Sequence, residues 1–226
     1  MNKTYILFDI DGTLIESGGA GKKAMMMSFT ECLESAHGLD NFSFAGQVDY
    51  RILKHFVSKV YVDPVKTEEV INKIKDRYIE YLSVTLKEAP AYKVYPHAKE
   101  LLSALDKNEQ YELGLMTGNI REGARLKLEH GSIWKYFKWG VFGDHVEERT
   151  VLADNALKEI SKREEKIDPG KIYIIGDTPF DIRCGKSIGA ATVAYISKKE
   201  FLKEIEALNP DHILYDYKDF INILER

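Results

Sequence analysis

Two aspartates stand two positions apart at the end of an apolar segment, and they carry the strongest chemical signal in the sequence. Large apolar side chains dominate residues 5–10, which predicts a strand buried on both faces, and Asp9 and Asp11 fall at its end. Residues at i and i+2 of an extended chain point to the same side. Burying two like charges is costly without a cation, and Mg²⁺ is the usual oxygen-liganded cation beside phosphate, so the pair predicts magnesium-dependent phosphate chemistry. The same Asp-Gly-Thr letters also occur as an ordinary turn, in which Gly12 lets the chain bend.

A second polar group follows another apolar segment. Thr117, Gly118 and Asn119 come directly after residues 112–116 and precede a helical pattern that begins near Ile120. Free N–H groups at the start of a helix bind anions, and a threonine hydroxyl can donate to a phosphoryl oxygen. Alone, this triplet is better explained as a helix cap. Beside the aspartate pair, we favour a phosphate site made by the threonine hydroxyl and the next two backbone amides.

A third group combines two further acids with a helix start. Asp177 ends the apolar segment 172–175, and Asp181 follows four residues later. Thr178 suits the N-cap of a helix and Pro179 its first position. Ligands of open α/β sheets gather at the carboxyl ends of strands, so these acids predict metal or phosphate binding. The alternative is that the two acids only stabilise the helix N-terminus.

The elements that must position these groups alternate along the chain. Helical spacing at residues 97–105 and 151–160 falls between short apolar segments, which predicts an α/β fold with a doubly wound, Rossmann-like parallel sheet. The expected strands are residues 5–10, 112–116, 139–142, 172–175, 191–196 and 212–214.

One region breaks the alternation. Residues 15–92 contain no comparable apolar strand, but amphipathic stretches at 24–33, 50–60 and 70–86 predict helices. We therefore expect a catalytic α/β core built from residues 1–14 and 93–226, with a helical cap inserted as residues 15–92.

These three motifs, in this order, resemble the haloacid dehalogenase superfamily of phosphohydrolases. Residues 9–13 match its Asp-x-Asp-Gly-Thr signature, Thr117 matches its strand-ending Ser or Thr, and residues 176–181 match its Gly-Asp-x-x-x-Asp motif. The insert after the first motif resembles the C1 helical cap of phosphoglycolate phosphatase-like members. The aspartate at position 11 favours a phosphatase, because the dehalogenase branch lacks an acid there.

The resemblance implies roles for individual residues. Asp9 is implied to be the nucleophile that becomes an aspartyl-phosphate, and Asp11 to protonate the leaving group and later activate water. Thr13 is expected to contact substrate. Mg²⁺ is expected at Asp9, Asp11, Asp177 and Asp181, the last through water or by ordering the site.

The family also has a cation beside the nucleophile, usually a lysine. No lysine stands directly after residues 139–142, and Arg149, at the start of the next expected helix, is the best candidate. Lys158 is the fallback, and a solvated surface arginine is the alternative to a functional one.

The cap contains further candidates for contact with an anionic substrate. The glycines before Lys22 resemble the entry into such caps, and residues 46–49 resemble a second cap loop, although Val48 replaces the usual threonine. Lys22, Arg51 and Lys54 could contact substrate, but each is more often a surface charge on a helix.

The overall properties narrow the class of protein. A net charge of −4 over 226 residues argues against a nucleic-acid partner, and no stretch approaches the length of a membrane span. We expect a cytoplasmic enzyme that acts on a small phosphorylated metabolite; the sequence leaves the oligomeric state and the particular ester open. A sugar-phosphate mutase, disfavoured by Gly176 where that branch has an acid, and a non-catalytic phosphate-binding protein are the alternatives.

Overall fold

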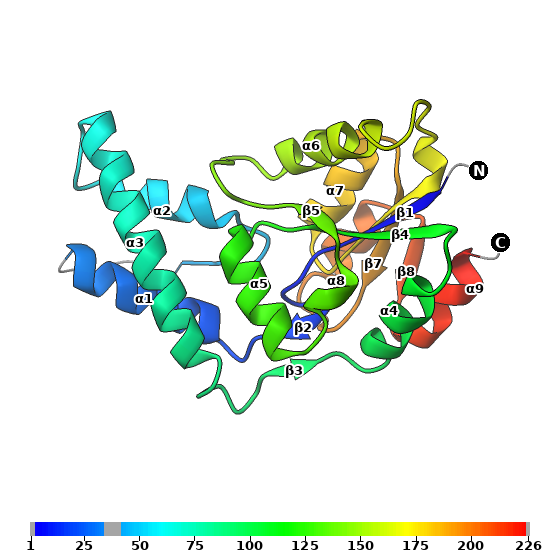
Figure 1. The fold of residues 1–226 in the computed structure, drawn as a ribbon, viewed down its shortest axis with the longest axis horizontal. Coiled ribbons are helices and arrows are strands. Elements are labelled where there is room, and N and C mark those ends of the chain that lie inside the picture. The colour runs from blue at the N-terminus through cyan, green and yellow to red at the C-terminus, as the bar shows by residue number, and fades with distance from the viewer. Residues whose placement is uncertain (1–2, 34–41, 225–226) are drawn as a thin grey trace.

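A six-stranded parallel sheet forms the centre of the fold. The computed structural model describes residues 3–33 and 42–224. The strands lie in the order β5-β4-β1-β6-β7-β8, and every neighbouring pair is parallel (Figure 1). Their bounds are β1 Thr4–Phe8, β4 Tyr111–Met116, β5 Trp139–Val141, β6 Ile172–Gly176, β7 Ala191–Tyr195 and β8 His212–Leu214.

Helices cover both faces of this sheet, which explains why the strands are apolar throughout rather than alternating. In β1, Ile6 and Phe8 pack on one face while Tyr5 and Leu7 pack on the other. The first face is covered by α4 (Ala98–Asp106), α5 (Arg121–His130) and α9 (Phe220–Leu224). The second is covered by α6 (Thr150–Ser161), α7 (Pro179–Ser187) and α8 (Leu202–Ala207).

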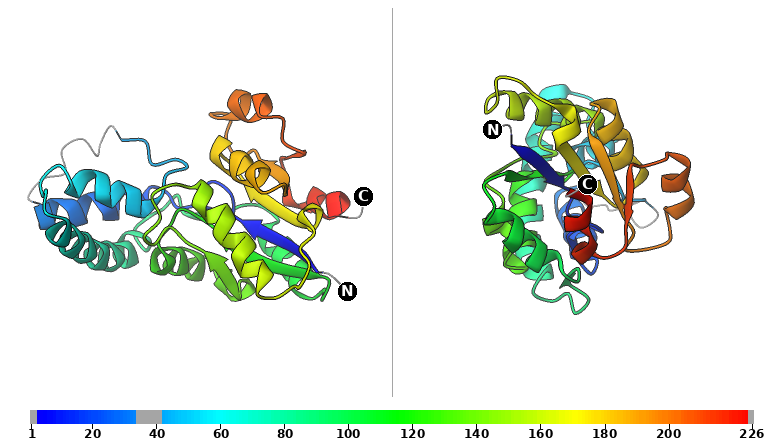
Figure 2. Two further views of the ribbon diagram at one scale, coloured as in Figure 1. Left: turned by 90° about the horizontal axis from the view of Figure 1, so that it is seen from above. Right: turned by 90° about the vertical axis from the view of Figure 1, so that its right-hand side faces the viewer.

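The inserted region forms a separate group of helices with its own apolar core. The helices are α1 (Ala20–Leu33), α2 (Asp49–Val57) and α3 (Pro64–Thr85), whose packed side chains include Phe29 and Tyr78. They lie at the end of the molecule toward which β1 points, away from the two termini (Figure 2). Thus the cap faces the carboxyl ends of the strands.

A two-stranded antiparallel ribbon joins the two regions. Strand β2 (Ile15–Glu16) pairs with β3 (Lys93–Val94), where the chain leaves the core and returns to it. The ribbon lies at the boundaries expected for the cap. The assignment of residues 15–92 to a distinct domain stays a prediction.

The predicted α/β fold is confirmed, with shifts at the ends of elements. The first strand ends at Phe8, before the aspartates, rather than at residue 10. The helix expected from residue 70 begins at Pro64, because the Asp63 side chain accepts the Lys66 N–H at 2.8 Å and caps it. Within the described ranges, the helices are too short or too polar to cross a membrane.

Candidate active site

The carboxyl ends of three strands meet beneath the cap, and a cavity of about 330 Å³ lies between them. Strands β1, β4 and β6 end at Phe8, Met116 and Gly176, so the residues that follow each strand come together at one edge of the sheet. The predicted site residues of the core that line the cavity are Asp9, Asp11, Gly118, Asn119, Arg149 and Asp177, and Lys127 and Thr178 line it as well.

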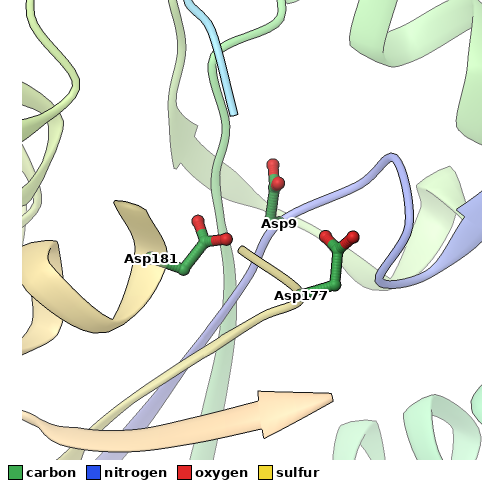
Figure 3. Close-up of side chains that lie close together, drawn as sticks. All are labelled: Asp9, Asp177 and Asp181. Carbon is green, nitrogen blue, oxygen red and sulfur yellow. The ribbon is translucent and has the colours of Figure 1, made fainter. Parts of the chain in front are cut away.

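Three carboxylates cluster at this edge. One carboxylate oxygen from each of Asp9, Asp177 and Asp181 lies within 4.8 Å of the others. Asp9 follows β1, Asp177 follows β6 and Asp181 belongs to α7, and Figure 3 shows their side chains converging on one space. An all-oxygen set of this kind is the donor chemistry that a hard divalent cation requires, so these residues could hold a metal ion.

Arg149 is the one cation bonded to this cluster among the described residues. Its Nη2 atom lies 2.7 Å from Asp9 Oδ2 and 2.6 Å from Asp181 Oδ1, and all three side chains are buried. The predicted candidate therefore lies against the expected nucleophile. Lys158, the fallback, is an exposed residue of α6 and does not line the cavity.

The cluster carries more negative charge than Arg149 can balance. Burial raises the pKa of Asp9 to about 6, although Arg149 opposes this rise. Burial and the nearby Asp181 and Asp9 carboxylates raise the pKa of Asp177 well above its ordinary value. Three carboxylates and one guanidinium leave a formal charge of −2, which a divalent cation would neutralise.

Asp181 contributes to this cluster mainly by fixing its geometry. Its Oδ2 accepts the Thr178 N–H at 3.1 Å and the Thr178 hydroxyl at 2.6 Å, while Oδ1 accepts from Arg149. This capping box starts α7 with Pro179 in its first turn, as the sequence predicts. Both Asp181 oxygens are thus already hydrogen-bonded, which suits the ordering role expected of it better than direct ligation.

Thr13 lies beneath the site rather than in it. It is fully buried, and its hydroxyl donates to Asp177 Oδ1 at 3.0 Å. Gly12, with φ of 83°, passes so close to Asp177 that a Cβ would fall 2.0 Å from Oδ2. The structure therefore places Thr13 as a residue that orients a carboxylate, not as the expected substrate contact, because the turn at Gly12 directs it inward.

Asp11 lies outside the acidic cluster. Strand β1 ends at Phe8 and the chain turns at Gly12, and the Asp11 carboxylate faces Lys127 of α5. Its Oδ2 accepts from Lys127 Nζ at 2.6 Å and from Asn119 Nδ2 at 2.9 Å. Burial would raise the pKa of Asp11, but the charge and hydrogen bonds of Lys127 and Asn119 hold it below its ordinary value.

Lys127 is the functional-site residue that sequence reasoning missed. It belongs to α5, and its side chain is only 6% exposed. Gly123, Ala124, Lys127 and Leu128 occupy the buried face of that helix. The available signal was this i, i+1, i+4, i+5 spacing, which places a lysine on a face that is otherwise small or apolar.

The Thr117–Asn119 segment is engaged by the protein itself. Asn119 donates from its backbone N–H to the Thr117 hydroxyl oxygen at 3.3 Å, and from its side chain at 2.9 Å. The next two backbone N–H groups, of Ile120 and Arg121, donate to the carboxylates of Asp49 and Asp144. The N–H groups of Ile120 and Arg121 at the start of α5 are thus bonded to side-chain anions, whereas phosphate binding by the backbone N–H groups of Gly118 and Asn119 stays a prediction.

The cap loop before α2 packs against this segment. The Asp49 N–H donates to the Gly118 carbonyl at 2.8 Å, and a Cβ on Gly118 would lie 2.2 Å from the Gln47 carbonyl oxygen. Only a residue without a side chain permits this approach. Gly118 is therefore required for cap contact, whatever its backbone N–H binds.

The three cap cations have different surroundings. Lys22 lines the cavity. Arg51 borders a separate hollow that Arg149 also lines, and Lys54 pairs with Glu147 outside the cavity. Of the three candidates for substrate contact, the structure brings only Lys22 to the site.

The comparisons with known proteins agree with this geometry. A family model described as haloacid dehalogenase-like hydrolase matches residues 6–195. The chain is 25% identical over 233 residues to pyrophosphatase PpaX of Oceanobacillus iheyensis, covering 99% of this chain and 98% of the relative. It is 27% identical over 223 residues to phosphoglycolate phosphatase of Aquifex aeolicus, covering 97% and 96%.

The fold is also found among solved structures. A protein described as a predicted phosphoglycolate phosphatase, from Haemophilus somnus 129Pt, superposes with a TM-score of 0.74 at 21% identity over 99% of both chains.

Proposed function

The chain belongs to the haloacid dehalogenase-like hydrolase family and is a hydrolase of the phosphatase type. On this premise we propose that it hydrolyses small phosphate monoesters with Mg²⁺, through an aspartyl-phosphate on Asp9. One observation carries the proposal. Asp9 is buried at the end of β1, with Arg149 2.7 Å from its carboxylate and Asp177 in the same acidic cluster. A carboxylate in that position can serve as a nucleophile, because cations beside it can also draw in a phosphate group.

In the first step an Asp9 oxygen attacks phosphorus and the bond to the ester oxygen breaks. The departing oxygen takes a proton from Asp11, which lines the same cavity. Arg149 lies against Asp9. Its guanidinium can therefore stabilise the negative charge first on the free carboxylate and then on the phosphoryl oxygens. When bound by Asp9 and Asp177, with Asp181 ordering them, Mg²⁺ supplies the positive charge that Arg149 alone does not.

The shape of the cavity supports a small substrate. The cap loop lies against Gly118, and the space between cap and core is about 330 Å³. Lys22 from α1 adds a positive charge on the cap side. Relatives named for pyrophosphate and phosphoglycolate hydrolysis support a small anionic metabolite as the substrate class. Closure of such a space around the ester would exclude water from the first step.

Phosphate release from a panel of phosphomonoesters, with Mg²⁺ and with EDTA, tests the proposal. The panel should hold phosphoglycolate, sugar phosphates, nucleotides and p-nitrophenyl phosphate, with the anhydride pyrophosphate tested beside them. We expect Mg²⁺-dependent release, at least about 10³-fold weaker in Asp9→Asn. The matched control is Asp154→Asn, which changes an exposed aspartate of α6 and should keep full activity.

Two results would contradict the proposed function. Folded wild-type protein that releases no phosphate from any ester would favour a binding protein. Conversion of a sugar phosphate to its isomer without phosphate release would favour a mutase.

A further inference from the structure

A lysine is buried where the fold does not need a charge. Lys127 occupies the inward face of α5 beside Ala124 and Leu128, where an apolar residue would pack without desolvating an ammonium group. Its Nζ lies 2.6 Å from Asp11 Oδ2 and 2.6 Å from Asn119 Oδ1. Both bonds point into the cavity that holds Asp9, so this charge belongs to the site and not to the packing of the helix.

Lys127, Asn119 and Asp11 form a closed set of hydrogen bonds. Asn119 accepts from Lys127 through Oδ1 and donates from Nδ2 to the same Asp11 oxygen at 2.9 Å. Asn119 Nδ2 also donates to the Thr117 hydroxyl oxygen at 2.9 Å, which ties the set to the end of β4. Two donors on one oxygen fix both the position and the plane of the Asp11 carboxylate.

The cap closes over the ammonium group of this lysine. A Cβ built on Gly21 of α1 would lie 3.3 Å from Lys127 Nζ and 3.7 Å from the Tyr78 hydroxyl of α3. Tyr92, which directly precedes β3, donates from its hydroxyl to the Lys127 backbone carbonyl at 2.7 Å. The lysine is thus held by core and cap together, at the place where the two regions meet.

We propose that Lys127 is a positioning residue which, together with Asn119, holds Asp11 as the base for hydrolysis of the aspartyl-phosphate. This inference rests on the proposed function. In that step water attacks phosphorus, the bond from phosphorus to the Asp9 oxygen breaks, and its electron pair returns to the carboxylate. The water proton passes to Asp11, which then holds the proton that the next leaving group receives. Lys127 and Asn119 both donate hydrogen bonds to Asp11, so they hold in place the carboxylate that must accept this proton.

The step can be isolated with p-nitrophenyl phosphate, whose leaving group departs without a proton. For this ester kcat/KM reports formation of the aspartyl-phosphate, whereas its hydrolysis enters only kcat. We expect Lys127→Met to lower kcat on the order of 10²-fold, within the range typical of a positioned base. KM should fall nearly in proportion, and a burst of nitrophenol equal to the enzyme concentration should precede the slow steady state.

Two further variants keep the test decisive. Asn119→Ala retains the backbone and should give the same pattern with a smaller loss, including in a preparation where Lys127→Met does not fold. Lys75→Met is the matched control, because Lys75 also lies between cap and core but bonds Asp144 at 3.4 Å, outside the cavity. It should leave both kcat and kcat/KM unchanged.

The outcomes separate this inference from the proposed function. If wild-type protein is active and Lys127→Met loses kcat/KM as much as kcat, the function stands and the positioning role is overturned. A rise in KM alone would also overturn it and would make Lys127 a substrate contact. If wild-type protein hydrolyses no ester, the proposed function fails and the inference fails with it.

Discussion

Two buried cations lie in one cavity, and they differ in how much negative charge each one faces. Arg149 bonds Asp9 and Asp181, with Asp177 nearby, so one cation faces three carboxylates. Lys127 bonds a single carboxylate, Asp11, and the neutral Asn119. The first arrangement leaves a formal charge of −2 that a divalent ion can balance, whereas Lys127 and Asp11 form a neutral bonded pair, with the Asp49 carboxylate also near Lys127.

This difference explains why two aspartates only two positions apart can do different work. Asp9 belongs to the acidic cluster, where a metal ion and a phosphate group can both be held. Asp11 accepts hydrogen bonds from Lys127 and Asn119, which fix its carboxylate. The strand ends at Phe8 and the chain turns at Gly12, so Asp9 and Asp11 do not share one extended segment.

The comparison predicts that replacing Arg149 lowers stability and activity more than replacing Lys127. Arg149→Met leaves the buried Asp9 and Asp181 carboxylates without their cation, and breaking such a pair costs about 3–5 kcal/mol of unfolding free energy. Activity should fall on the order of 10²–10³-fold. Lys127→Met should destabilise less, because the Asp11 side chain is 36% exposed and water can solvate it. Urea unfolding at pH 7 in EDTA measures the stability of both variants. Equal losses of unfolding free energy would contradict the proposed difference between Arg149 and Lys127.

Metal binding should follow the same division. Saturating Mg²⁺ at about 100 times its Kd should stabilise wild-type protein by about 2.7 kcal/mol. Asp177→Asn should lose most of this gain, because it removes a cluster carboxylate. Asp11→Asn should retain it, because the Asp11 side chain bonds Lys127 and Asn119 instead. Thermal unfolding with Mg²⁺ and with EDTA gives the answer, and loss of the gain in Asp11→Asn would return Asp11 to the metal ligands.

The two sides of the cavity also differ in how far the sequence predicted them. Asp9, Asp177 and Arg149 follow strands or begin a helix, and a parallel sheet brings such positions to one edge, so their meeting could be predicted. Lys127 was missed although its spacing places it on the buried face of α5, because a lysine in a helical pattern is usually assigned to solvent. Asp49 was missed because its bond to the Ile120 N–H depends on where α2 lies against α5.

Asp49 offers a pH-dependent test of the contact between cap and core. Burial raises the pKa of Asp49 to about 6, so the folded state binds a proton between about pH 4 and 6 that the unfolded state does not. This group therefore lowers stability as pH rises through that window, by at most about 1.4 kcal/mol per pH unit, and has no further effect above it.

The matched variant is Asp49→Asn, which keeps an oxygen acceptor for the Ile120 N–H and removes the charge. Urea unfolding of both proteins at several pH values from 4.5 to 7 should show a more positive slope of stability against pH in the variant. Parallel slopes would mean that Asp49 is solvated and that the contact is looser than the structure has it.

The smallest expected effect concerns the cap lysines. Lys22 lines the cavity, whereas Lys54 pairs with Glu147 of the core outside the cavity, where both side chains are exposed. Lys22→Ala should therefore raise KM for an anionic ester about three- to tenfold, corresponding to about 0.7–1.4 kcal/mol of lost binding, with kcat nearly unchanged. Lys54→Ala removes only an exposed ion pair and should leave KM within about twofold of wild type. Steady-state kinetics with phosphoglycolate, which carries an extra carboxylate, and with phenyl phosphates that have uncharged p-substituents would show whether the effect of Lys22 grows with the charge of the substrate. An equal effect of both lysines would mean that the cap attracts substrate by its overall charge, and that Lys22 makes no specific contact.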